Sequence, residues 1–413
     1  YNLTPQNNLL KNIKLSLVIM DKVKEYLNQW SSSYKEDLLT NIMPFWMQFG
    51  WDRKHGGVYT CVNRDGSLMD TTKSVWFQGR FAFVCSFAYN TIEKNPEWLE
   101  AAKSTLDFIE KYCIDTDGHM FFEVTDNGEP IRKRRYVFSE SFAAIAMAEY
   151  AQATGDKTYA EKALKIFKQI KHLTETPGLL PSKYCDSVKM QGHSLTMILI
   201  NTASRIRQVI SDPILDEQIE WSINQIRKHF IHPEFKALLE TVGPNGEFLN
   251  TNMGRTINPG HCIETAWFIL EEAKYRNWDK ELVDLGLTIL DWSWEWGWDK
   301  EYGGIINFRD CLNLPPQDYS QDMKFWWPQT EAIIAALYAY EATGDPKYIE
   351  MHKQISDYTY AHFPDKEYGE WYGYLRRDGS VAQPAKGNLF KGPFHIPRMM
   401  IKSYDLCKEI ISK

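Results

Sequence analysis

The sequence predicts an all-α protein folded as an (α/α)6 barrel, with short β-hairpins in the long loops on one face. Three observations support this fold class. Helical segments of two kinds alternate along the chain, one short phrase recurs at equivalent junctions, and long connections precede only one kind of helix.

The two kinds of helical segment differ in how their apolar residues are distributed. Residues 141–150 (SFAAIAMAEY) and 331–341 (EAIIAALYAYE) are small or apolar on all sides, which indicates helices buried all round. In residues 158–170, apolar side chains recur at helical spacing, with lysines on the opposite side. This second kind of helix is amphipathic, as expected for a helix that covers the first kind.

The two kinds alternate in a fixed order. Buried helices are expected to begin near Val75, Ser139, His193, His261, Pro328 and His395. An opening helix is expected from about Asp21 to Gln48, and further amphipathic helices near Asn95, Gly155, Asp212, Trp278 and Gly344. The phrase ATGD occurs at 153–156 and 342–345, where its glycine suits the end of a buried helix. Six such pairs close most simply into two concentric rings, with an open α-solenoid as the alternative.

The connections that lead into the buried helices are long and carry strand-like hairpins. WDRKHGG at 51–57 recurs as WDKEYGG at 298–304, with related pieces at 115–118 and 365–369. Aspartate and glycine supply the turns of such hairpins. Long loops in a compact domain are usually functional, so the face that they build is expected to hold the site.

The composition is that of an ordinary globular protein of 413 residues with a formal net charge of −7. Nucleic acid is excluded as a partner, because no basic excess is present to neutralise phosphates. No apolar run approaches the length that spans a bilayer, so no membrane partner is expected. The seven cysteines are scattered without a CxxC pair, which fits free thiols in a reducing compartment, and we expect a cytoplasmic protein.

A single barrel domain is expected over residues 21–413. Residues 1–20 are expected to form a leader, a poorly ordered N-terminus or the start of a helix. Lys11 and Lys14 break the apolar patch of this segment, which argues against a signal peptide. A homodimer is left open.

The first turns of the buried helices carry polar residues, although these helices are otherwise apolar. The residues are Gln78, Arg80, Glu140, His193, His261, Glu264, Gln329, Glu331 and His395. All are expected to meet at the long-loop face, where helix N-termini favour negative charge. Singly, such a glutamate is commonly a cap and a buried histidine is usually structural. Their joint occurrence on one face indicates a site.

His261 and Glu264 are three residues apart, so they share a helix face and the carboxylate could orient the imidazole. The same spacing could serve a metal. However, no third ligand has suitable local spacing and no HExxH is present, so no metal is expected. The absence of GxGxxG and GxxxxGK[ST] from the sequence argues against NAD and conventional P-loop nucleotide chemistry, and no cofactor is expected.

Two imidazoles across a cavity can handle a proton on either face of one carbon at neutral pH. This chemistry suits a cofactor-free epimerase or isomerase that acts beside a carbonyl group. A glycosidase would instead need two opposed carboxylates. Glu140, Glu264 and Glu331 keep that alternative open.

Five ordered motifs resemble the N-acylglucosamine 2-epimerase family, also known as renin-binding proteins. They are WFQGR (76–80), GHCIET (260–265), KFWWPQTEA (324–332), GEWYGYLRRDG (369–379) and KGPFHIPR (391–398). The similarity runs from about Lys35 to the C-terminus. It implies an (α/α)6 barrel and the interconversion of N-acetylglucosamine and N-acetylmannosamine, by deprotonation and reprotonation at C2 through an enediolate. The expected substrate is therefore a small amino sugar.

The resemblance places the two catalytic histidines at His261 and His395, the site arginine at Arg80 and the site glutamates at Glu264 and Glu331. His193 matches a further site histidine of cellobiose 2-epimerases and is a candidate for opening the sugar ring. We assign Trp76, Gln78, Trp326 and Gln329 to substrate binding, and expect Glu264 to orient His261 and Arg80 to hold the anionic oxygen of the enediolate.

Three alternatives stay open at this point. The wider superfamily includes aldose–ketose isomerases and cellobiose 2-epimerases, although Phe390 here replaces a tryptophan of the cellobiose enzymes. The name renin-binding protein raises a non-catalytic binder. Some members of the family are activated by ATP, so ATP is a candidate allosteric activator, although the sequence shows no clear nucleotide site.

Overall fold

The computed structural model describes the backbone of residues 5–413 and the side chains of residues 20–413. Six buried helices form an inner ring: α3 (Val75–Thr91), α5 (Phe138–Thr154), α7 (Ser194–Arg207), α10 (Pro259–Tyr275), α12 (Trp326–Thr343) and α14 (His395–Ser412). Each contacts the next along the chain, and α14 contacts α3. The ring is therefore closed, which confirms the barrel and excludes the open solenoid.

Six outer helices cover this ring: α1 (Pro5–Asp37), α4 (Pro96–Tyr112), α6 (Lys157–Glu175), α8 (Pro213–Gln225), α11 (Lys280–Gly297) and α13 (Pro346–His362). The two ATGD phrases form the expected junctions. Gly155 and Gly344 end α5 and α12 in the left-handed conformation, with φ of 73° and 68°. Asp156 and Asp345 then cap the outer helices that follow. No helix of the described chain has both the length and the apolar character needed to cross a membrane.

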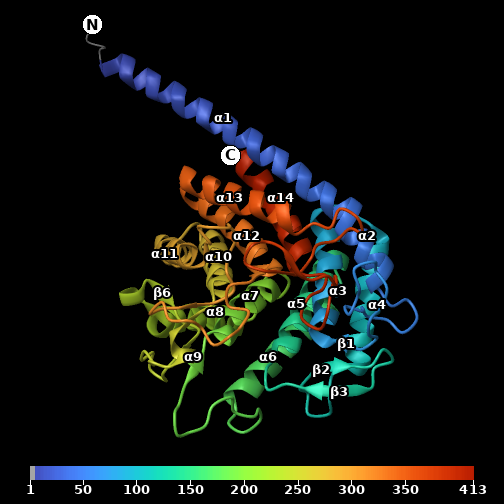
Figure 1. Ribbon diagram of the computed structural model, residues 1–413. Helices are drawn as coiled ribbons and strands as arrows, with labels where there is room; N and C mark the ends of the chain where they lie inside the picture. The colour runs from blue at the N-terminus through green and yellow to red at the C-terminus, as the bar shows by residue number, and fades with distance from the viewer. Residues whose placement is uncertain (1–4) are drawn as a thin grey trace.

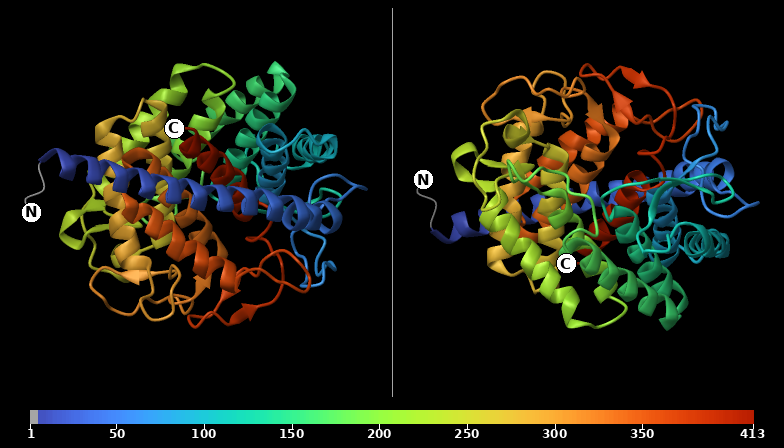
Figure 2. Two further views of the ribbon diagram at one scale, coloured as in Figure 1. Left: turned by 90° about the horizontal axis from the view of Figure 1, so that it is seen from above. Right: turned by 90° about the horizontal axis from the view of Figure 1, so that it is seen from below.

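Helix α1 begins at Pro5, well before the expected start at Asp21. It runs across one side of the barrel and projects beyond it (Figure 1), and the view from above shows it lying over the other helices (Figure 2). The boundary expected at residue 20 is absent from the backbone, because residues 6–20 contain neither proline nor glycine to end a helix. Residues 1–4 of that expected segment lie outside the described chain.

Helical structure continues beyond α1 to Gly50. It passes through a π-helical stretch at Leu38–Ile42, the short α2 (Met43–Phe45) and a second π-helical stretch at Trp46–Gly50. A third π-helical stretch, Ile226–Phe230, extends α8, and a 3-10 turn (Pro233–Phe235) and α9 (Asn252–Arg255) follow it.

All strands lie in the long connections that lead into inner helices, and all pair antiparallel. They are β1 (Lys73–Ser74), β2 (Phe121–Val124), β3 (Pro130–Lys133), β4 (Gln191–Gly192), β5 (Ile231–His232), β6 (Ala237–Leu238), β7 (Thr241–Val242), β8 (Thr256–Ile257), β9 (Arg309–Asp310), β10 (Lys324–Phe325), β11 (Tyr374–Leu375) and β12 (Val381–Gln383). Two three-stranded sheets have the orders β1-β2-β3 and β10-β11-β12, and the pairs β4-β7, β5-β6 and β8-β9 complete the set. The hairpins gather on one face, as expected; β2 and β3 lie at the edge opposite α1 (Figure 1).

The repeated Asp-Gly hairpins are fastened by buried lysines. Lys73 Nζ donates to Asp52 at 2.7 Å, Lys324 to Asp299 at 3.0 Å and Lys386 to Asp365 at 2.7 Å. In each copy the aspartate also accepts backbone N–H groups of its own turn, as Asp52 does from residues 54 and 55. These three Asp–Lys clips hold the long loops against the barrel.

Candidate active site

A cavity of about 530 Å³ opens where the inner helices begin. Its polar wall is formed by Arg80, Glu240, His261, Glu264, His395 and Arg398. Its apolar wall is largely aromatic and includes Trp76, Phe142, Trp326, Trp327, Phe390 and Phe394. Side chains from α3, α10, α12 and α14 thus converge at the loop face, where the sequence predicted the site.

His261 stands in the first turn of α10, which Pro259 opens and Asn258 caps by accepting the His261 N–H. Its Nδ1 lies 3.0 Å from Oε1 of Glu240. Burial by itself would lower the pKa of His261, but the charge of Glu240, with a smaller effect of Glu264, raises it above the usual value. The imidazole is therefore biased toward its protonated form.

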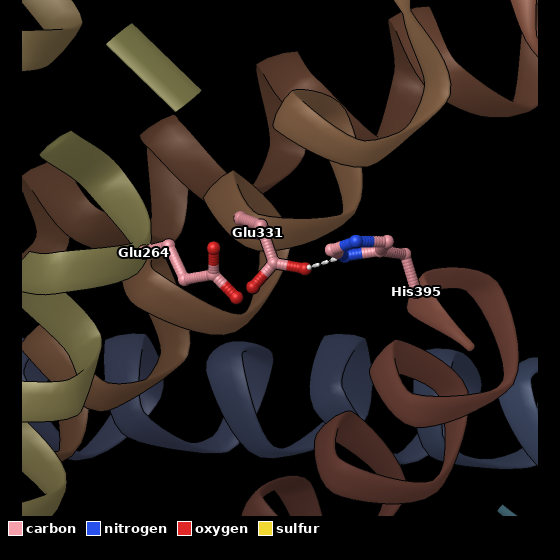
Figure 3. A group of neighbouring side chains, drawn as sticks. All are labelled: Glu264, Glu331 and His395. Atoms are coloured by element: carbon pink, nitrogen blue, oxygen red, sulfur yellow. Dashed lines mark hydrogen bonds and ion pairs between the residues drawn. The ribbon is translucent and has the colours of Figure 1, made fainter. Parts of the chain in front are cut away.

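His395 is the first residue of α14, and its Nδ1 lies 2.7 Å from Oε1 of Glu331. Figure 3 shows this contact, with the Glu264 carboxylate on the far side of Glu331. Burial, together with the positive charges of Arg398 and Arg80, lowers the pKa of His395 well below the usual value. At neutral pH this imidazole is uncharged and can act as a base.

Both histidines use Nδ1 to contact a carboxylate, which fixes the ring orientation. Among the described residues, the Nε2 atoms of His261 and His395 make no hydrogen bond. A carboxylate on Nδ1 holds the proton there and leaves Nε2 for a ligand. The arrangement therefore presents two oriented imidazoles, one biased toward acid and one toward base.

Arg398 bridges the two glutamates of the site. Its terminal nitrogen donates to Glu264 at 2.8 Å and to Glu331 at 2.7 Å, and all three side chains are buried. Trp267 Nε1 donates to the other oxygen of Glu331 at 2.8 Å. Glu264, Glu331 and His395 lie close enough together to hold a metal ion, and the guanidinium of Arg398 already donates to both of the carboxylates.

Arg80 is buried and lines the cavity, yet among the described residues it makes no hydrogen bond or ion pair. Its guanidinium lies over the rings of Phe142 and Phe394, at 4.1 and 4.5 Å from the ring centres. Burial and then the charge of Arg398 lower its pKa to about 9, so it stays charged at neutral pH. A buried cation without a partner is suited to receiving an anionic oxygen of a ligand.

The structure brings Trp76, Arg80, His261, Glu264, Trp326 and His395 to the cavity wall, with Glu331 directly behind His395. The sequence suggested that Glu264 orients His261, but in the structure it does not. Its carboxylate is held by Arg398, and the partner of His261 is Glu240 from the loop between β6 and β7.

Gln78 and Gln329 do not line the cavity. Gln78 Oε1 accepts from Val58 N at 2.7 Å, and its amide donates to the carbonyls of Val58 and Ser74. Gln329 makes the same pattern with Ile305, again at 2.7 Å. Both amides are fully engaged in fastening a loop, which differs from the substrate-binding role expected from the sequence.

His193 is fully buried behind the cavity wall. Its Nε2 lies 3.1 Å from the hydroxyl of Thr265, and its Nδ1 is 3.9 Å from Glu240. Burial lowers its pKa to about 4, so it is neutral. The ring supports the Glu240–His261 pair from behind and does not face a ligand.

Glu140 is also outside the cavity, because its Oε1 contacts His119 Nδ1 and accepts from Met120 N, both at 2.6 Å. Glu264 and Glu331 share one arginine and therefore lie on the same side of the cavity. Two opposed carboxylates, which a glycosidase needs, are not offered by the three glutamates that suggested one.

Sequence reasoning missed three residues of the site: Glu240, Arg398 and Trp327. Arg398 was visible inside KGPFHIPR, three residues after His395 and hence on the same helix face. Trp327 is four residues before Glu331, which is again one face. Glu240 lies in a loop without periodicity, and nothing in the sequence points to it.

Comparisons with known proteins identify the family of this chain. The family model described as N-acylglucosamine 2-epimerase (GlcNAc 2-epimerase) matches residues 57–392. The N-acylglucosamine 2-epimerase of Rattus norvegicus is 34% identical over 404 residues, covering 95% of this chain and 94% of the relative. The human protein of that name is 33% identical over 412 residues, with coverage of 95% and 94%.

Solved structures share the fold. The cellobiose 2-epimerase of Bacillus thermoamylovorans B4167 superposes with a TM-score of 0.80 at 22% identity, covering 92% of this chain and 99% of the other. A D-mannose isomerase superposes with a TM-score of 0.75 at 16% identity, with coverage of 93% and 97%.

The barrel with its two-histidine cavity and these matches define the class of protein, an isomerase. The matched family model and the relatives also identify the family within this class. The chain belongs to the N-acylglucosamine 2-epimerase family.

Proposed function

We propose that this protein is a sugar 2-epimerase that interconverts N-acyl-D-glucosamine and N-acyl-D-mannosamine. The observation that carries the proposal is the pair His261 and His395 in one cavity, each held by a carboxylate at Nδ1. Both rings are free at Nε2 to exchange a proton with one carbon. The names of the relatives and the motif set support an N-acyl hexosamine as the substrate.

The reaction takes place on the open-chain sugar. In one direction, neutral His395 takes the proton from C2, and the electron pair of the C–H bond moves to give an enolate with negative charge on the C1 oxygen. It is an enolate, and not the enediolate expected from the sequence, because C2 of the substrate carries the acylamino nitrogen. The unpaired guanidinium of Arg80 donates to that oxygen and stabilises the charge. Protonated His261 then gives its proton to C2 from the opposite face, and C2 is inverted.

The reverse direction uses the same two groups with exchanged roles. After a turnover, His395 carries the proton and His261 is neutral, so exchange with solvent restores the starting state. That state is the favoured one, because Glu240 stabilises a charged His261 while Arg398 and Arg80 oppose a charged His395. Proton transfer and charge stabilisation are both supplied by side chains, so we propose that no cofactor takes part.

Several further features belong to the proposal. The free cysteines, of which only Cys185 is exposed, fit a reducing compartment, and we place the protein in the cytoplasm. Activation by ATP rests on the family resemblance, and a homodimer remains a prediction. A related aldose–ketose isomerase or cellobiose-type 2-epimerase would use the same two bases, whereas a non-catalytic renin-binding type would need neither.

The test is turnover of N-acetylmannosamine in D2O, followed by NMR. We expect signals of N-acetylglucosamine with deuterium at C2. Accumulation of a ketose would instead show an aldose–ketose isomerase, and product with C2 fully protonated at early conversion would contradict exchangeable bases.

Single variants assign the bases. His261→Asn and His395→Asn should each abolish net epimerisation, while one of them still exchanges the C2 proton of a single epimer. His172→Asn, at an exposed histidine on α6, is the matched control and should keep full activity. Full activity in both site variants would contradict the assignment of His261 and His395 as the two bases.

A further inference from the structure

Trp327 lies between the two histidines of the cavity. The centre of its indole is 5.3 Å from the ring centre of His261 and 5.8 Å from that of His395, with an interplanar angle of 41° in both cases. The side chain is partly buried and lines the cavity. A single aromatic ring is therefore shared by both imidazoles.

Gly260 makes room for this indole. A Cβ atom at position 260 would lie 2.4 Å from Cη2 of Trp327 and 2.5 Å from Cζ3, far inside contact distance. The ring thus rests directly on the backbone that precedes His261. Through this contact the first turn of α12 fixes the first turn of α10, and with it the position of the His261 imidazole.

The neighbouring tryptophan differs. Trp326 is buried, its ring is 6.2 Å from that of His395, and it packs against Tyr374 and close to the ammonium of Lys391. Among the aromatic pairs of the described residues, Trp326 makes no contact with His261. The sharing of both histidines belongs to Trp327.

Each histidine has its own charged neighbours. His261 is faced by Glu240 and Glu264, with His193 behind Glu240. His395 is faced by Glu331 and Glu264, by the cations Arg398 and Arg80, and by His261. Each imidazole therefore has its own carboxylate partner, Glu240 for His261 and Glu331 for His395. The proposed reaction, in contrast, moves one positive charge from one ring to the other.

An indole attracts a cation that lies within about 6 Å of its centre, and tryptophan does so more strongly than phenylalanine. Both imidazoles satisfy this distance. We propose that Trp327 is a positioning residue of the two-base reaction: its indole, seated against Gly260, sets the separation of His261 and His395 and stabilises whichever of them carries the proton. This inference rests on the proposed epimerase function.

Three variants test it. Trp327→Leu removes the aromatic face, Trp327→Phe keeps one, and Gly260→Ala keeps the indole but displaces it. We expect Trp327→Leu to lower kcat by about tenfold, with a smaller change in KM, and Trp327→Phe to recover most of the loss. Trp221→Leu, at an exposed tryptophan on α8, is the matched control and should change neither constant.

Two readouts separate this role from packing. The pKa of His261, followed by NMR of its ring protons in the resting enzyme, should fall by about half a unit in Trp327→Leu and less in Trp327→Phe, since a favourable cation–π contact is lost. In D2O, Trp327→Leu and Gly260→Ala should return more deuterated substrate per molecule of product than the unchanged enzyme, because the second base no longer meets the same carbon.

The outcomes are distinct. A higher KM with unchanged kcat, His261 titration and partition of deuterium would make Trp327 a plain wall for the sugar and overturn the proposal. If Trp327→Leu does not fold, Trp327→Phe and Gly260→Ala decide the question by the same readouts. Failure of the epimerase function itself would show as an inactive unchanged enzyme, while the NMR titration would still report on Trp327.

Discussion

Nδ1 of His261 lies 3.0 Å from Oε1 of Glu240, a residue from the long connection that leads into α10. This carboxylate raises the pKa of His261 against the effect of burial, whereas His395 is held neutral by burial and two arginines. The two histidines are therefore biased in opposite directions before a sugar arrives, His261 toward its protonated form and His395 toward its neutral form.

Glu240→Gln should move the alkaline limb of the pH profile of kcat/KM to lower pH. The limb reflects loss of the proton from His261, and removing the negative charge lowers the pKa of that proton. The acid limb, set by His395, should stay in place. Glu234→Gln is the control, because Glu234 holds His232 with the same 3.0 Å geometry outside the cavity. An unmoved alkaline limb would contradict the role given to Glu240.

Arg398→Gln should raise the pKa of His395, because Arg398 is the first of the positive charges that lower it. The acid limb of kcat/KM is then expected at higher pH. The variant also leaves Glu264 and Glu331 buried without their cation, a change that typically costs about 3–5 kcal/mol of stability. Urea unfolding measures the stability. The pH dependence of kcat/KM, determined per molecule of folded enzyme, gives the position of the acid limb. Unchanged values in both would refute the shared ion pair.

Arg80→Lys keeps the charge but loses the planar fork of the guanidinium. If Arg80 stabilises the enolate, kcat should fall by about 10²–10³, with a much smaller rise in KM. Steady-state kinetics in both directions give the two constants. A rise in KM alone would show that Arg80 binds the substrate and its transition state equally.

The Asp–Lys clips predict a graded effect on stability. Lys73→Met leaves Asp52 buried without its lysine, while Lys324→Met leaves Asp299 with a second cation, Arg377, at 2.9 Å. Removal of one partner of a buried pair costs about 3–5 kcal/mol, so Lys73→Met should approach that range and Lys324→Met should cost clearly less. Urea unfolding of the two variants side by side checks this order, and equal losses would show that Arg377 does not compensate.

The same clips make stability depend on pH. Their contacts lower the pKa of Asp52, Asp299 and Asp365 below the value in an unfolded chain, although burial by itself would raise it. This contribution is fully present above about pH 4 and is lost as the pH falls further. The fold should therefore weaken steeply in acid, and a clip variant should lose less on acidification than the unchanged protein.

The alternation of helices could be predicted because apolar periodicity is a property of short stretches of chain. To predict which side chains point into the cavity, the direction of each residue around its helix is needed as well. Gln78 and Arg80 are two residues apart on α3, which separates their directions by about 200°, so only one of them can face the cavity. Gln329 and Glu331 on α12 obey the same geometry. Counting residues from the helix start found the correct face of the barrel but not the correct side of each helix.

Glu240 could not be predicted for a different reason. It sits between two strands of two residues each, and its backbone bonds run to His193 and Thr256, which are distant in sequence. Its place beside His261 depends on how several long loops pack together. The sequence left the start of a helix within residues 1–20 open, and the short apolar patch did not place that start at Pro5. A helix once begun continues until a breaker ends it.

Each of the three clips divides the long loop that carries it into a base fastened to the barrel and a tip outside the clip. In the third copy, Glu370 stands where Gly57 and Gly304 occur, with φ of 54°, and pairs with fully buried Lys391, where the other copies have Gln78 and Gln329. The base can thus be rebuilt with different chemistry while the barrel beneath is kept. The stretch 312–319, between Asp299 and Lys324, is largely exposed and lies outside the strands and the cavity wall, so we expect it to vary in length and sequence without disturbing the cavity. We expect a barrel built in this way to acquire new substrates through changes in its loop tips, while the inner helices keep His261 and His395 in place.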